Sequence, residues 1–134
     1  MAKWVKWGIS PEGYHNLILE LVKKIKETER KFSKVYGIPR GGSIIAVYLS
    51  HYLNIPIADI VFDQTTLIVD DIADTGKTLK PYSEAFFTAT LHYKSRSIVT
   101  PDIYIKKVEN KDWIVYPYEM SSEIPNRELP NKPT

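Results

Sequence analysis

The 134-residue sequence contains no cysteine and no long apolar run, and its charges nearly cancel. Without cysteine the chain can form no disulfide and can carry out no thiolate chemistry. No apolar stretch approaches the roughly 20 residues that a transmembrane helix needs, and the first residues lack the apolar centre of a signal peptide. We therefore expect a cytoplasmic protein with no membrane segment. The net charge of +2 argues against a dedicated nucleic-acid-binding surface.

Length and patterning predict a single small α/β domain. A chain of this length can build one sheet with covering helices, but it has no room for a separate substrate domain. Strands and helices alternate, which predicts a parallel sheet that binds its ligand at the carboxyl edge. We assign residues 1–119 to this domain and residues 120–134 to a carboxyl-terminal tail. The expected strands cover residues 35–38, 57–62, 66–71, 88–93, 103–108 and 113–115, and the expected helices follow Ser10 and cover residues 43–53 and 77–87.

The most informative segment runs from Leu67 to Leu79 and reads LIVDDIADTGKTL. Its branched start is typical of a strand buried on both faces, and Asp70 and Asp71 follow where the chain leaves the sheet. Asp74 and the small residues after it form a turn whose amides and hydroxyls suit a phosphate. Adjacent carboxylates can accept hydrogen bonds from the two hydroxyls of a ribose, so the segment predicts a phosphorylated sugar as ligand. The alternative is a plain strand-to-helix turn with Asp74 as helix cap.

A second glycine-rich turn follows the strand expected at residues 35–38 and precedes another expected helix. Arg40 stands directly before Gly41 and Gly42. A guanidinium beside exposed backbone amides can grip the oxygens of a pyrophosphate in pairs. The alternative is an ordinary turn that needs glycine for its shape and leaves Arg40 on the surface.

The sequence Gly-Lys-Thr at positions 76–78 also occurs in nucleoside-triphosphate P-loops, but a P-loop needs a glycine five positions earlier, where this chain has Asp71. The segment instead resembles the phosphoribosyl pyrophosphate (PRPP) binding motif of the type I phosphoribosyltransferases, and the turn at Arg40 resembles their pyrophosphate loop. This resemblance implies a Rossmann-like parallel sheet flanked by helices, with a reduced hood. It also implies that Asp74 acts as general base, and that Asp70 and Asp71 bind ribose hydroxyls and, indirectly or together with substrate, Mg²⁺. The other substrate-binding positions implied in the two turns are Arg40, Gly41, Gly42, Ala73, Thr75, Gly76, Lys77 and Thr78.

The ends of the domain are similar to the small xanthine-guanine phosphoribosyltransferases, in the opening Val-Lys-Trp at 5–7 and in the Trp-Ile-x-x-Pro pattern that begins at Trp113. This similarity implies transfer of a phosphoribosyl group from PRPP to guanine, xanthine or hypoxanthine, giving a nucleoside monophosphate and pyrophosphate. Lys94 would donate to the exocyclic oxygen of the base, and Trp113 and Ile114 would form the base pocket. The alternatives are a surface charge for Lys94 and a core or interface aromatic for Trp113.

One family feature is missing from this sequence. Phosphoribosyltransferases usually carry a long mobile loop that closes over the site, whereas only residues 63–65 connect the strands expected at 57–62 and 66–71. We expect the second subunit of a homodimer, or the tail at 120–134, to cover the site instead. The alternative function is a non-catalytic regulator that senses a nucleotide or PRPP, because the same fold serves some transcriptional regulators in this way.

Overall fold

The computed structural model describes residues 4–60 and 63–119, so the expected tail at 120–134 lies outside the described residues. No helix within these two ranges is long and apolar enough to cross a membrane. The elements along the chain are β1 (Val5–Gly8), α1 (Pro11–Glu27), β2 (Lys34–Gly37), α2 (Gly41–Leu53), β3 (Thr66–Ala73), α3 (Lys80–Ser83), β4 (Phe87–Lys94), β5 (Ile103–Val108), β6 (Asp112–Val115) and a 3₁₀ turn at Pro117–Glu119.

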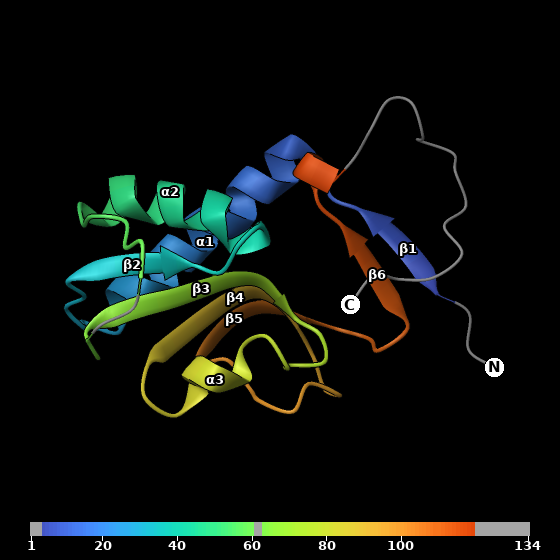
Figure 1. Ribbon diagram of the computed structural model, residues 1–134. Helices are drawn as coiled ribbons and strands as arrows, with labels where there is room; N and C mark the ends of the chain where they lie inside the picture. Colours follow the sequence, from blue (N-terminus) through green and yellow to red (C-terminus); the bar gives the residue numbers. More distant parts are fainter. Residues whose placement is uncertain (1–3, 61–62, 120–134) are drawn as a thin grey trace.

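The main sheet has the strand order β2-β3-β4-β5, and every neighbouring pair is parallel. Helices α1 and α2 cover one face of this sheet, and the short α3 lies on the other (Figure 1). The apolar stripe of α1, which includes Leu17, Leu21 and Ile25, packs into the core between these layers. The predicted parallel α/β architecture is therefore confirmed.

Two helix ends match the signals in the sequence. Ser10 caps α1 because its side chain accepts a hydrogen bond from the Gly13 amide, and Pro11 occupies the first helical turn. Helix α2 ends at Asn54, whose backbone lies in the left-handed region at φ 55°. Helix α2 begins just after the carboxyl end of β2, so it runs from the carboxyl edge of the sheet back toward the amino edge.

Strands β1 and β6 form a second, two-stranded parallel sheet beside the first (Figure 1). The expectation of one sheet was wrong on this point. A tight turn, in which the Glu109 amide donates to the Asp112 carboxylate, separates β6 from β5 and turns the chain toward β1. The indole of Trp7 also donates to Asp112, at 3.0 Å, and so ties the two strands together.

The strand expected at residues 57–62 is not formed in its described part, residues 57–60. Only Ile57 makes a single bridge, to Val35 on the outer edge of β2. Ile57 and Ile60 are about half exposed, so the branched residues that suggested a strand do not face a core here. The described parts of the link between α2 and β3 thus stay near the amino edge of the sheet, away from the turns that follow β2 and β3.

The helix expected at residues 77–87 is also much shorter than predicted. Only Lys80–Ser83 is helical, and β4 already begins at Phe87. Gly76 has a φ of 83°, in the left-handed region that a helix does not use, and residues 77–79 form a turn before the short helix begins at Lys80. Any phosphate held at this place must therefore be held by the turn itself.

Candidate active site

The two predicted ligand-binding turns meet at the carboxyl edge of the main sheet. They meet because β2 and β3 are parallel neighbours, so the residues after each strand lie at the same edge. A Cβ added at Gly41 would lie 2.1 Å from Asp71 Oδ2, and one added at Gly42 would lie 2.4 Å from the Val69 carbonyl oxygen. Only glycine permits this approach, so the turn after β2 and the acidic end of β3 form one site.

The acidic pair at the end of β3 is held by the backbone beside it. Asp70 is almost completely buried and accepts a hydrogen bond from the Asp71 amide at 2.9 Å. Asp71 accepts from the Ile72 amide at 2.7 Å. Burial, followed by the charge of Asp71, raises the pKa of Asp70 well above its usual value. A cation at this place would favour the ionised form of Asp70.

Two tyrosines around Pro117 support Asp71, and the sequence reasoning did not identify them. The Tyr118 hydroxyl donates to the Asp71 carboxylate, and the Tyr116 hydroxyl donates to the Asp71 carbonyl oxygen at 3.1 Å. His92 Nδ1 lies 2.7 Å from the Tyr116 hydroxyl. Burial lowers the pKa of His92 to about 4, so the imidazole is neutral at pH 7. Because the Tyr116 hydroxyl donates to the carbonyl, it accepts from His92 Nδ1–H. The signal in the sequence was the Tyr-Pro-Tyr run that follows β6.

Asp74, the predicted general base, is held between two cations. Arg96 Nε donates to Asp74 Oδ1 at 2.8 Å, and Lys94 Nζ lies 3.4 Å from the same oxygen. Lys94 is completely buried and also donates to the Asn110 carbonyl at 3.2 Å. Burial lowers the pKa of Lys94 to about 8, and the charge of Arg96 acts in the same direction. The structure thus brings the predicted Lys94 to Asp74 and adds Arg96, which the sequence reasoning missed because it lies beyond the end of β4.

The turn at residues 74–78 is fixed by the loop that follows β4. The Ile98 amide donates to the Thr75 carbonyl at 2.9 Å. A Cβ added at Gly76 would lie 2.4 Å from Ser97 Oγ, so both the positive φ and the close contact require glycine. Within the described residues, the amides of Gly76 and Thr78 donate to no acceptor of the chain. These amides can hold an anion.

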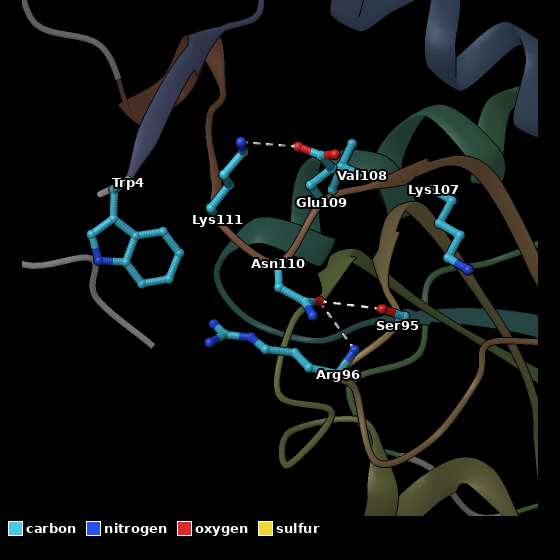
Figure 2. A pocket seen from close by; sticks show the side chains of 8 residues that line it. All are labelled: Trp4, Ser95, Arg96, Lys107, Val108, Glu109, Asn110 and Lys111. Carbon is cyan, nitrogen blue, oxygen red and sulfur yellow. Dashed lines mark hydrogen bonds and ion pairs between the residues drawn. The ribbon is translucent and has the colours of Figure 1, made fainter. Parts of the chain in front are cut away.

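The remaining predicted base-pocket residues lie on β6, in the second sheet. Trp113 is buried, and Lys6 Nζ lies 5.8 Å from the centroid of its ring. The Ile114 side chain packs into the main core, so a ligand could reach only its backbone. A different tryptophan, Trp4, borders a cleft of about 800 Å³ together with Arg96. Figure 2 shows Trp4 and Arg96 among the residues that line this cleft.

The described residues contain no group of three or more histidine, aspartate or glutamate side chains placed to hold a metal ion. Asp70 and Asp71 nevertheless offer the hard oxygen donors that Mg²⁺ prefers. Mg²⁺ commonly keeps several waters and binds through one or two carboxylates together with substrate phosphates. The donor set therefore fits an ion that arrives with a phosphorylated substrate.

This fold and this edge of the sheet define an α/β protein with a candidate site for a phosphorylated sugar. No protein-family model matches the chain. The xanthine-guanine phosphoribosyltransferase of Cereibacter sphaeroides is 32% identical over 116 residues, which cover 65% of this chain and 69% of the relative. The crystal structure of a purine phosphoribosyltransferase from Pyrococcus horikoshii matches with a TM-score of 0.74 and 29% identity, over 89% of this chain and 97% of that chain.

These matches identify the family: the chain belongs to the type I phosphoribosyltransferases, which are enzymes. A protein from Neisseria gonorrhoeae, crystallised with bound ppGpp, matches with a TM-score of 0.72 and 22% identity, over 91% of this chain and 93% of that chain. At this identity the likeness shows the fold alone.

Proposed function

We propose that the chain is a purine phosphoribosyltransferase of purine salvage that transfers the 5-phosphoribosyl group of PRPP to a 6-oxopurine. The products are a nucleoside monophosphate and pyrophosphate. The observation that carries the proposal is the placement of Asp74, which lies between the cations of Lys94 and Arg96 and is the first residue of the turn at residues 74–78. The purine activities named for the relatives from Cereibacter and Pyrococcus support the choice of substrate.

PRPP would bind along the carboxyl edge of the main sheet. The amides and hydroxyls from Ala73 to Thr78, with Lys77 among them, would hold the 5-phosphate. Asp70 and Asp71 would accept hydrogen bonds from the ribose hydroxyls. The guanidinium of Arg40 and the amides at positions 40–42 would hold the pyrophosphate. All three binding elements lie at or just beyond the carboxyl ends of β2 and β3, so one ligand can span them.

In the reaction, a nitrogen of the base forms a bond to C1 of the ribose while the bond from C1 to the pyrophosphate oxygen breaks. Positive charge develops on the sugar, so the carboxylates of Asp70 and Asp71 stabilise it. Asp74 would take the proton that the base nitrogen loses. Arg96 fixes the orientation of Asp74, because it contacts the carboxylate through Nε and through a terminal nitrogen.

Mg²⁺, held by the pyrophosphate with Asp70 or Asp71, would neutralise the charge of the leaving group. The raised pKa of Asp70 fits this role, because a divalent cation would offset the repulsion between the two carboxylates. We expect the ion to bind together with the substrate, and we expect the protein to be a cytoplasmic homodimer.

The proposal also has to name the segment that covers the bound substrates in place of the family's long loop. The described residues of the link between α2 and β3 lie at the amino edge of the sheet, where Ile57 bridges to Val35. This position beside β2 supports a cover that comes from another part of the protein. We propose the segment 120–134 or a second subunit. Truncation after Glu119 should lower turnover if the segment is the cover, and unchanged turnover would leave the second subunit as the candidate.

A direct test is a spectrophotometric assay of the purified chain with PRPP, Mg²⁺ and each of guanine, xanthine, hypoxanthine and adenine. Nucleotide formation with the 6-oxopurines, abolished by EDTA and restored by Mg²⁺, is the expected result. Formation of product with adenine alone would show that the base assignment is wrong. Absence of product with all four bases would reject the enzyme function.

The second candidate is a non-catalytic sensor of a purine nucleotide. Two observations favour it: the family's long loop is missing from this chain, and the Neisseria protein with the same fold was crystallised with ppGpp. Calorimetry with PRPP, GMP and ppGpp separates the two candidates. A sensor would bind one of these ligands and give no turnover, whereas the enzyme would bind PRPP and convert it.

A further inference from the structure

The indole of Trp4 lies against the two cations that hold Asp74. Lys94 Nζ lies 4.9 Å from the centroid of the Trp4 ring, and Arg96 Cζ lies 5.4 Å from it. Figure 2 shows the Arg96 side chain extending toward Trp4. Trp4 directly precedes β1 and is 38% exposed. It therefore lies at the rim of the site, where it can move more readily than a core side chain.

The Lys94 ammonium has three donors, and within the described residues three groups contact it. Asp74 Oδ1 lies at 3.4 Å, the Asn110 carbonyl oxygen at 3.2 Å, and the face of the Trp4 indole completes the set. Together with the surrounding chain, these contacts leave Lys94 completely buried. A 6-oxopurine can accept a hydrogen bond from Lys94 only if one of these contacts is released.

Of the three contacts, the one with Trp4 is the easiest to release. A cation–π contact at a partly exposed site is weaker than a hydrogen bond between an ammonium and a carboxylate. Asn110 lies in the turn between β5 and β6, and its side chain accepts hydrogen bonds from Ser95 and from the Arg96 amide, so its carbonyl is held in place.

We propose that the purine base binds against Lys94 and Arg96 in the place that the Trp4 indole occupies, and that binding of the base displaces Trp4. The inference rests on the proposed function. An indole and a purine are both flat fused rings, and a guanidinium stacks on either. The cleft of about 800 Å³ borders Trp4 and Arg96, so it gives the base an entrance and the displaced indole a place to move. Trp4 is then a determinant of base affinity, and Arg96 is part of the base site.

The test uses Trp4→Ala with Trp7→Ala as the matched control, since Trp7 is an exposed tryptophan of the adjoining strand whose loss weakens the tie of β1 to β6 but leaves Trp4 in place. We expect Trp4→Ala to lower the KM for hypoxanthine and the Kd for GMP by about three- to tenfold, which is the scale of the cation–π contacts that no longer compete. The KM for PRPP should stay within about twofold. GMP should change the tryptophan fluorescence of the wild type and of Trp7→Ala. The part of this change that comes from Trp4 should be absent in Trp4→Ala.

A rise in the KM for hypoxanthine in Trp4→Ala would show that the indole is a wall of the base site, and this would overturn the proposal. Unchanged values in that variant would overturn it as well, because Trp4 would then lie outside the path of the base. Failure of the proposed function gives a different result, since the wild type would then make no nucleotide. In that case the GMP titrations of Trp4→Ala and Trp7→Ala still decide whether a purine displaces Trp4. Circular dichroism melting of both variants checks that they are folded.

Discussion

Lowering the pH from 7 to 5 should weaken the fold through His92, which is 2% exposed and donates to Tyr116. Burial lowers the pKa of His92 from 6.5 to about 4 in the folded chain. Below pH 6.5 the unfolded chain takes up a proton that the folded chain does not, so stability falls as the pH falls toward 4. From these two pKa values, the loss in unfolding free energy between pH 7 and pH 5 is about 2 kcal/mol.

The assay is urea unfolding followed by circular dichroism at both pH values, with wild type and His92→Asn compared. The asparagine amide can still donate toward Tyr116 but does not titrate. His92→Asn should be less stable at pH 7, yet its loss between pH 7 and pH 5 should be smaller than that of the wild type by about 2 kcal/mol. His51→Asn, at the exposed end of α2, controls for loss of a histidine as such. Equal losses in wild type and His92→Asn would refute the reasoning.

Three further predictions concern the carboxyl edge of the sheet. Tyr118→Phe removes the hydroxyl that donates to the Asp71 carboxylate, so the KM for PRPP should rise about tenfold in steady-state assays; an unchanged KM would mean that Tyr118 does not position Asp71. Gly76→Ala places a Cβ 2.4 Å from Ser97 Oγ at a φ of 83°, so thermal melting should show a loss of about 1–2 kcal/mol or more, and wild-type stability would contradict this turn geometry. Asp70→Asn removes a buried charge whose pKa is raised, so at pH 7 it should stabilise the chain by about 1 kcal/mol and lower turnover. The gain in stability should shrink at acid pH as the wild-type carboxyl is protonated, and a gain that grew instead would contradict the sign of this shift.

The sequence predicted the centre of the fold because the information there is local. Strand β3 begins as an apolar branched run that leads into Asp70 and Asp71, and it pairs with β2 and β4 as a parallel sheet requires. The meeting of the two turns followed from that topology alone. The two elements that were predicted wrongly, the strand at 57–62 and the helix at 77–87, were also inferred from local sequence. The branched residues at 57–60 face solvent, and the residues after Gly76 form a turn where an uninterrupted helix was expected.

The rest of the candidate site could not be predicted, because its contacts join residues far apart in the chain. Arg96 reaches Asp74 across the loop after β4, and Tyr118 reaches Asp71 from beyond β6. Trp4 reaches Lys94 because β1 pairs with β6, and a four-residue strand carries too weak a periodicity to be recognised by itself. Residue type offered no substitute, since arginine is mostly exposed whatever its role, and tyrosine and tryptophan are often part of the ordinary core.

The central claim, that Asp74 acts as the base in phosphoribosyl transfer, is tested most directly by the turnover of Asp74→Asn with PRPP, Mg²⁺ and the 6-oxopurine that the wild type uses best. Asp59→Asn, an exposed aspartate near the amino edge of the sheet, is the matched control. The account predicts that Asp74→Asn lowers kcat by about 100-fold or more while PRPP binding by calorimetry stays within a few fold, and that the control behaves as wild type. Wild-type turnover in Asp74→Asn would contradict the account.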